Sequence, residues 1–297
     1  MLTNGDLHVV VFLPDAKEGY YRAERFDWSG VIGCASYHGH TYWGEWFHNY
    51  DPLVNDSITG PVEEFRPAEG AQGYSSAPAG GVFVKIGVGV LRKVADVPYH
   101  FGDSYPIVDT GRWSIHTGKR SITFQQRLRA PDGISYIYTK KLVLNHTGLV
   151  LTHSLKNLGA ASIVTDVYDH DFFMLDGQPT GPGFELHLPF APVPDTPLLP
   201  GAVVRGHDIA YLKELQPKET VAAYLSGYGS SASDYSILLE NTRTHTGIEQ
   251  TGDMPISRFY LWSIRSTICP EAYIHLDIAP GHTGKWAIHY RFLTNVR

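Results

Sequence analysis

A histidine flanked by two aspartates is the residue of this sequence best suited to proton transfer. His170 lies between Asp169 and Asp171 and is followed by Phe172 and Phe173. An imidazole titrates near neutral pH, and a neighbouring carboxylate can orient its ring and raise its basicity. His170 therefore fits a general acid or base. The alternative from local sequence is a structural histidine that one of the aspartates satisfies.

Glu271 is the second candidate for proton transfer. It lies among apolar and aromatic residues that include Trp262 and Tyr273. Burying an unpaired carboxylate is costly, so Glu271 should be paired, functional or exposed at a strand edge. With His170 it would complete a minimal acid–base pair. Spacing alone does not show that the two residues meet.

Strands, rather than helices, must position these residues. No long segment repeats apolar residues at helical spacing, and 30 glycines and 19 prolines divide the chain into short pieces. A strand is expected at residues 7–13. Closely spaced runs then predict an antiparallel meander over residues 121–128, 136–144, 149–155 and 162–168. Further strands are expected at 221–225, 236–240, 259–264, 273–278 and 286–292.

Two irregular regions interrupt this pattern. Residues 36–80 are rich in Gly, Pro, His and aromatic side chains, and residues 177–201 are rich in Pro and Gly. Long irregular segments in a compact domain are usually functional loops or disorder, and the aromatic content of the first region favours an ordered loop. We find no internal repeat and no linker. The sequence therefore predicts an all-β protein with one large antiparallel β-sandwich domain over residues 1–297.

An aromatic and histidine-rich segment at residues 37–48 reads Tyr-His-Gly-His-Thr-Tyr-Trp-Gly-Glu-Trp-Phe-His. A His-x-His pair can ligate a metal when further ligands converge, but no third ligand is suitably spaced, so no metal is predicted. The aromatics suit hydrophobic packing or a sugar-stacking loop beside a cleft. Nearby, Asp56, Glu63, Glu64 and Arg66 form either a polar cluster for sugar hydroxyls or a solvated turn.

Composition argues against several partners. The net charge is −6 and the basic residues are scattered, so nothing favours nucleic acid or an anionic membrane. The Gly-x-Gly within residues 80–89 lacks a βαβ context, so no dinucleotide site is predicted. No charged start followed by a long apolar stretch is seen, so we expect no signal peptide and a cytoplasmic location. Cys34 and Cys269 are expected to be buried free thiols.

Several segments resemble galactose mutarotase and related aldose 1-epimerases. Asp166–Phe173, a histidine with paired aromatics after a strand, is similar to their Asn-His-x-Tyr-Phe-Asn segment. Residues 262–286 resemble their Cys-x-Glu and Leu-x-Pro-Gly motifs, especially in the hexose-6-phosphate mutarotase branch. Residues 138–159 fit the strands before the family's histidine. The resemblance keeps its order over about residues 80–293. It implies the galactose mutarotase-like super-sandwich, with a sugar cleft on its concave face.

The resemblance also implies a sugar isomerase that needs no metal or organic cofactor and acts on a small-molecule sugar or sugar derivative. The residue matching Glu271 would remove the anomeric hydroxyl proton, and the residue matching His170 would protonate the ring oxygen. We expect this base and acid on opposite sides of one sugar, about a ring apart. The residues expected to bind the sugar are Asp56, Glu64, Arg66, His40, Trp43 and Trp262.

Two departures from the family pattern indicate a divergent branch. Thr59 stands where an upstream histidine is expected, and Asp169 replaces the asparagine before the catalytic histidine. Both changes favour a different or modified sugar. Because one fold hosts many functions, two alternatives stay open. One is another carbohydrate enzyme on the same fold, such as a lyase, and the other is a non-catalytic sugar-binding module.

Overall fold

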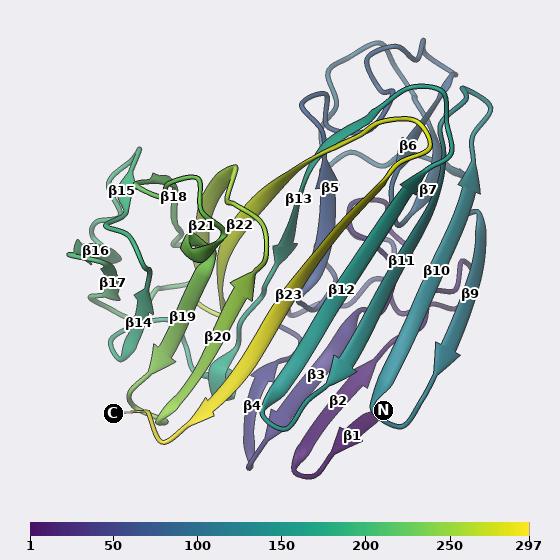
Figure 1. Cartoon of the computed structure of the whole chain (residues 1–297). Coiled ribbons are helices and arrows are strands. Elements are labelled where there is room, and N and C mark those ends of the chain that lie inside the picture. The colour runs from purple at the N-terminus through teal and green to yellow at the C-terminus, as the bar shows by residue number, and fades with distance from the viewer. Residues whose placement is uncertain (297) are drawn as a thin grey trace.

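The computed structural model describes residues 1–296, and its regular structure is almost entirely antiparallel strand. The largest sheet has ten strands in the order β16-β17-β14-β19-β20-β23-β12-β11-β10-β9. Figure 1 shows its long strands β23, β12, β11 and β10 side by side. Its strands are β16 (Ala202–Arg205), β17 (Asp208–Tyr211), β14 (Phe184–His187), β19 (Ser236–Asn241), β20 (Thr246–Gly252), β23 (Thr283–Thr294), β12 (Gly148–Asn157), β11 (Ser135–Leu144), β10 (Ser121–Arg129) and β9 (Arg112–Thr117).

A second sheet of six strands, in the order β15-β18-β21-β22-β13-β5, packs against the first. Alternate residues of its strands face either the large sheet or the outside. In β13, for example, Val167 belongs to the core between the sheets, whereas Tyr168 faces away from the large sheet. The six strands are β15 (Val193–Pro194), β18 (Val221–Ser226), β21 (Arg258–Ile264), β22 (Thr267–Ile278), β13 (Ile163–His170) and β5 (Val62–Arg66).

Two small sheets and two short helices complete the described chain. A four-stranded sheet contains β1 (Leu2–Asn4), β2 (Leu7–Val11), β3 (Ile32–Tyr37) and β4 (His40–Trp43), and a three-stranded sheet contains β6 (Val82–Lys85), β7 (Gly89–Arg92) and β8 (Ile107–Asp109). The helices, both of the 3-10 type, are η1 (Leu175–Gly177) and η2 (Ala232–Asp234).

Two hydrophobic clusters hold these sheets together. The larger cluster fills the space between the ten-stranded and six-stranded sheets with residues such as Phe65, Tyr138 and Trp286. The smaller cluster is built from N-terminal segments and the three-stranded sheet, and it includes Phe26 and Phe172. Because Phe172 directly follows β13, this second core supports the chain just beyond His170.

Within residues 1–296, no helix combines the length and the apolar character that a membrane crossing requires.

The prediction of an all-β antiparallel sandwich is confirmed, but the meander is shorter than expected. Strands β10, β11 and β12 are neighbours in chain order, as predicted. The expected fourth strand, β13, lies in the other sheet, because β23 occupies the free edge of β12. The two irregular regions also contain short strands, among them β4, β5 and β14. This crossing of β13 is what delivers His170 to the outer face of the six-stranded sheet.

Candidate active site

His170 and Glu271 are cross-strand neighbours on the outer face of the six-stranded sheet. The β13–β22 register runs to Val167 opposite Ile274 and resumes at the isolated bridge between Phe173 and Ile268. This register puts His170 directly opposite Glu271. Their side chains are in contact, with His170 Nε2 lying 3.3 Å from Glu271 Oε1.

The pair is closer than the expected separation of one sugar ring. It lies side by side on one floor instead of on opposite sides of a cleft. This arrangement still suits the chemistry, because the anomeric hydroxyl and the ring oxygen of a sugar are bonded to the same carbon. Two groups in contact can therefore reach both oxygens at once.

The pair opens into a cavity of about 260 Å³, which we call the central cavity. Its floor is the outer face of the sheet and contains Arg66, His170, Tyr224, Tyr260, Trp262 and Glu271. Its walls come from loops before β3, after β4, after β7 and after β13, and they contain Arg25, Trp46, Asp56, Phe101 and Phe172. Aromatic faces and a few charged groups around a small space are typical of a small-ligand site.

Aromatic side chains hold the imidazole of His170 in place. The Phe172 ring stacks on it with centroids 3.9 Å apart and planes 8° apart, and Trp46 stacks on the far side of Phe172. Trp262 meets the imidazole edge-on at 5.7 Å. Phe172 has φ 44°, an uncommon conformation for a bulky residue, and its N–H donates to Cys269 Sγ. Local backbone strain is therefore stored next to the candidate acid.

Burial sets the protonation of the pair. Burial lowers the pKa of His170 well below its usual value, with Arg25 acting in the same direction. Burial raises the pKa of Glu271 to about 8, despite the opposing effects of Arg25 and of the hydrogen bond from the Tyr273 hydroxyl. Near neutral pH the pair thus contains one proton, held mainly by the carboxyl group and close to His170 Nε2.

A buried ion cluster lies beside the central cavity. Glu64 Oε2 accepts hydrogen bonds from Arg25 Nε at 3.0 Å and the Tyr168 hydroxyl at 2.7 Å, and Oε1 accepts from Lys85 Nζ at 3.2 Å. Burial alone would raise the pKa of Glu64, but Lys85 and Arg25 outweigh it and lower the pKa. Arg25 also pairs with Asp56 at 2.6 Å on the cavity wall. Glu64 therefore holds Arg25 in position at the wall of the central cavity.

The structure brings four of the predicted sugar-binding residues to this region. Asp56, Arg66 and Trp262 line the central cavity, and Glu64 lies behind it. The remaining two are elsewhere, which corrects the sequence-based expectation. Trp43 is only 2% exposed and packs in the large core, and His40 contacts Asp176 at 3.0 Å.

The histidines of the aromatic segment also point to separate partners. His38 Nδ1 lies 3.2 Å from Asp6, whereas His40 contacts Asp176. Over residues 1–296, no group of three or more His, Cys, Asp or Glu side chains is arranged to hold a metal ion. Both cysteines are free, and Cys34 is half-buried whereas Cys269 is buried.

Sequence reasoning missed several lining residues. Trp46 belongs to the same aromatic segment as Trp43, but it follows the end of β4 and reaches the cavity. Tyr224 and Tyr260 lie on the same outer face as Trp262. The period-two alternation of β18 and β21 could have predicted this shared face. Arg25 lies in an irregular segment, so no local pattern could place it.

Asp169 and Asp171 do not orient His170, contrary to expectation. Both are buried and face the interior, where the Tyr290 hydroxyl lies 2.6 Å from Asp169 and 2.9 Å from Asp171. Burial raises the pKa of Asp169 to about 8 and raises that of Asp171 well above its usual value. Asp169 must face inward because adjacent residues of a strand point to opposite faces.

The segment expected to supply an upstream histidine has a structural role. Thr59 is fully buried and donates a hydrogen bond to the Ile32 carbonyl at 2.7 Å. A Cβ atom on Gly60 would lie 2.6 Å from the backbone oxygens of His170 and Asp171. Only glycine allows this close approach. Gly60 therefore lets its segment pack directly against the backbone of His170 and Asp171.

Solved structures share this arrangement of strands. A putative aldose 1-epimerase from Escherichia coli K12 matches with a TM-score of 0.58 at 13% identity, over 97% of this chain and 99% of that chain. A galactose mutarotase-like protein from Clostridium acetobutylicum gives 0.59 at 10% identity, over 98% and 100%. The GalM/aldose epimerase homologue from C. elegans gives 0.57 at 13% identity, over 90% and 93%.

No protein-family model and no curated protein sequence matches the chain. The chain thus has the galactose mutarotase-like fold, as the sequence resemblance implied. At these identities the similarity defines the fold alone, and the reaction must be argued from the site.

Proposed function

We propose that the protein interconverts the anomers of a reducing sugar, with Glu271 and His170 exchanging protons with the anomeric hydroxyl and the ring oxygen. The observation that carries this proposal is the 3.3 Å contact between the two side chains on the floor of the 260 Å³ central cavity. A cavity of this size suits one sugar ring.

In the proposed reaction, Glu271 as carboxylate takes the proton of the anomeric hydroxyl while His170 gives a proton to the ring oxygen. The bond between the anomeric carbon and the ring oxygen breaks as the carbonyl forms. Rotation about the C1–C2 bond and the reverse proton transfers close the ring on the other face. The pair begins and ends with one proton, so no other acid or base is consumed.

The reactive form has the proton on His170, whereas the empty pair holds it mainly on Glu271. Arg25 and Arg66 lower the pKa of both Glu271 and His170, and the Glu64 carboxylate raises the pKa of both. The short distance between the two side chains makes this internal transfer direct.

The floor and the walls of the cavity supply binding and orientation. Trp46 and Trp262 offer aromatic faces for the C–H faces of a sugar, and the Arg25–Asp56 pair and Arg66 offer groups for its hydroxyls. Holding the sugar against a prearranged acid–base pair accounts for a large part of the rate increase that the proposed reaction requires.

Polarimetry and NMR exchange spectroscopy on glucose and galactose test the proposal. We expect accelerated interconversion of anomers by the wild-type protein and loss of that acceleration in His170→Ala and Glu271→Gln. An unchanged rate in both variants would refute the assignment. Sugar binding without interconversion would indicate a binding module, and release of an unsaturated uronate from a polysaccharide would indicate a lyase.

A further inference from the structure

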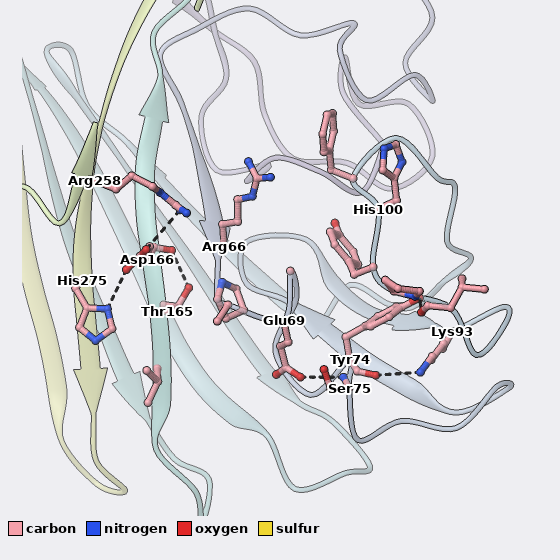
Figure 2. A pocket seen from close by; sticks show the side chains of 18 of the residues that line it. Arg66, Glu69, Tyr74, Ser75, Lys93, His100, Thr165, Asp166, Arg258 and His275 are labelled. Atoms are coloured by element: carbon pink, nitrogen blue, oxygen red, sulfur yellow. Dashed lines mark hydrogen bonds and ion pairs between the residues drawn. The ribbon is translucent and has the colours of Figure 1, made fainter. Parts of the chain in front are cut away.

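A second, larger cavity adjoins the central cavity. It has a volume of about 870 Å³, and we call it the side cavity. The two cavities share Arg66 and Phe101 as lining residues. The side cavity is also bordered by Tyr99, Asp166, Arg258 and His275, several of which Figure 2 shows facing the same space. A ligand held in the central cavity can therefore extend past Arg66.

The floor of the side cavity continues the floor of the central cavity. Arg66 lies opposite Asp166 in the β5–β13 ladder, and Asp166 lies opposite His275 in the β13–β22 ladder. Asp166 precedes His170 by four residues, and His275 follows Glu271 by four, so all four side chains share the outer face. The two cavities thus occupy successive positions along the same strands.

The arginines of the side cavity have hydrogen-bond donors to spare. Arg258 lies 4.0 Å above the Tyr273 ring, and its Nε and Nη2 atoms are buried without a hydrogen bond. Nη2 lies 3.4 Å from Asp166 Oδ2 in an ion pair without a hydrogen bond, and the other oxygen of Asp166, Oδ1, lies 2.8 Å from His275 Nδ1. Arg66 makes no side-chain hydrogen bond or ion pair with residues 1–296, although, against the effect of burial, the charge of Glu64 raises its pKa. Buried donors without partners are uncommon, so the guanidinium of Arg258, with Arg66 lining the same cavity, points to an anionic ligand.

The acidic and basic groups of the opposite wall are already satisfied. Glu69 accepts from the backbone N–H groups of Gly73 and Ser75, and Lys93 donates to the carbonyls of Tyr74 and Ala77. Figure 2 shows the contacts of Glu69 with Ser75 and of Lys93 with Tyr74 away from the two arginines. The guanidinium donors without hydrogen bonds therefore lie on the floor of the side cavity and not on its opposite wall.

We propose that the side cavity binds the second unit of a reducing oligosaccharide, and that this unit bears a carboxylate recognised by Arg258 and Arg66. The inference rests on the proposed function, because the reducing end must occupy the central cavity. The size of the side cavity favours a whole sugar ring over a lone phosphate group, and Tyr99 and Phe101 offer aromatic surface to that ring. The ligand class is an acidic oligosaccharide of uronate type.

Anomer interconversion of digalacturonate and of its neutral counterpart, galactobiose, tests the proposal in the wild type and in Arg258→Gln. We expect a KM at least about tenfold lower for digalacturonate in the wild type at low salt, the size of one charged hydrogen bond. Arg258→Gln should remove this preference while kcat stays within about twofold. Arg205→Gln, an exposed arginine in β16, is the matched control and should change neither constant.

Calorimetric titration separates this inference from the proposed function. The inactive variant Glu271→Gln, with and without Arg258→Gln, is titrated with digalacturonate, galactobiose and glucose 6-phosphate. Binding of digalacturonate that depends on Arg258 supports the side cavity even if no sugar is interconverted. Equal binding with and without Arg258 would overturn the inference. The inference would also be overturned if Arg258 strengthened the binding of glucose 6-phosphate as much as that of digalacturonate. A phosphate group alone would then account for the recognition.

Discussion

Residues 1–296 contain two buried histidine–glutamate contacts, one on each face of the six-stranded sheet. In the interior, His153 Nε2 lies 2.6 Å from Glu63 Oε1, and Lys140 forms an ion pair with the other oxygen of Glu63. On the outer face, His170 Nε2 lies 3.3 Å from Glu271 Oε1 beside the central cavity. The residue types are the same, but the surroundings differ.

The surroundings decide which pair has a mobile proton. Burial alone would raise the pKa of Glu63, but Lys140 and His153 outweigh it and lower the pKa to about 2. No lysine contacts Glu271, so burial raises its pKa to about 8. The interior pair is a fixed charge network, whereas the outer pair keeps one proton and faces an open space. In the proposed mechanism, the reaction therefore depends on the absence of a lysine beside Glu271 as much as on the presence of the acid and base.

The largest predicted effect is that of Glu271→Gln on catalysis. The amide resembles the protonated carboxyl group in shape but cannot accept the anomeric proton. We expect the rate of anomer interconversion to fall by about 10²- to 10⁴-fold, the usual contribution of an acid–base group, with circular dichroism unchanged. Glu18→Gln, at an exposed position, is the control. A variant that keeps most of the activity would contradict the role of the outer pair.

The interior pair should affect stability rather than turnover. Glu63→Gln leaves Lys140 buried without its partner, so the free energy of unfolding should fall by about 3 to 5 kcal/mol. The activity per folded molecule should change much less than in Glu271→Gln. Urea denaturation and anomer interconversion measured on the same samples check both statements. The double variant with Lys140→Met should recover part of the loss, because it removes the unpaired charge.

The pH dependence of stability should have opposite signs for the two glutamates. Glu271 has a raised pKa in the folded state, so its contribution is complete below about 4.5, the ordinary value, and is lost as the pH rises through about 8. The free energy of unfolding of Glu271→Gln, relative to that of the wild type, should thus rise by more than about 1.4 kcal/mol between pH 5 and pH 9. This figure is the free-energy value of one pKa unit.

Glu63 provides the internal control for that measurement. Its pKa is lowered to about 2, so its contribution is present above about 4.5 and is lost as the pH falls toward 2. The destabilisation in Glu63→Gln should therefore shrink as the pH falls from about 4.5 toward 2. Activity of the wild type should decline above about pH 8, because the outer pair then loses its only proton. A rate that keeps rising through pH 9 would contradict a shared proton.

The smallest predicted effect is that of Trp46→Ala. Trp46 stacks on Phe172, which in turn stacks on the imidazole of His170. Aromatic pairs of this kind contribute about 0.5 to 1.5 kcal/mol. We expect a two- to tenfold rise in KM with a smaller change in kcat, and recovery with Trp46→Phe, as measured by initial rates. An equal change at Trp113, a tryptophan of the ten-stranded sheet outside the central cavity, should leave KM unchanged.

Sequence patterns predicted the strands well where alternation was regular. The runs at β10, β11, β12, β21 and β23 agree with the structure within a few residues. The partner of β13 could not be predicted, because alternation defines the faces of a strand but not the neighbouring strand. This is why the pairing of His170 with Glu271 was expected from the family resemblance and not from spacing. The resemblance implied about one sugar ring between them, whereas the structure has them in contact.

The remaining errors at the site have local physical causes. The β3–β4 hairpin turns at His38 and Gly39, both with positive φ, and its register shifts before Trp43, so that Tyr42 and Trp43 are both buried in the large core. Trp46 lies beyond the last strand residue and escapes that constraint. Arg25 is positioned by Glu64 and Asp56, which are distant in sequence. Such long-range charge pairs leave no periodic signal in a single sequence.

The adjacent glutamates of β5 have a consequence for folding. β5 is an edge strand that pairs only with β13, so few ladder hydrogen bonds define its alignment. A shift by one residue would turn Phe65 toward the outside and Arg66 into the large core. It would also take Glu63 away from Lys140 and His153. A shifted register of β5 is thus unfavourable on both faces of the sheet. The buried charge pairs therefore help to select the correct register of β5 during folding.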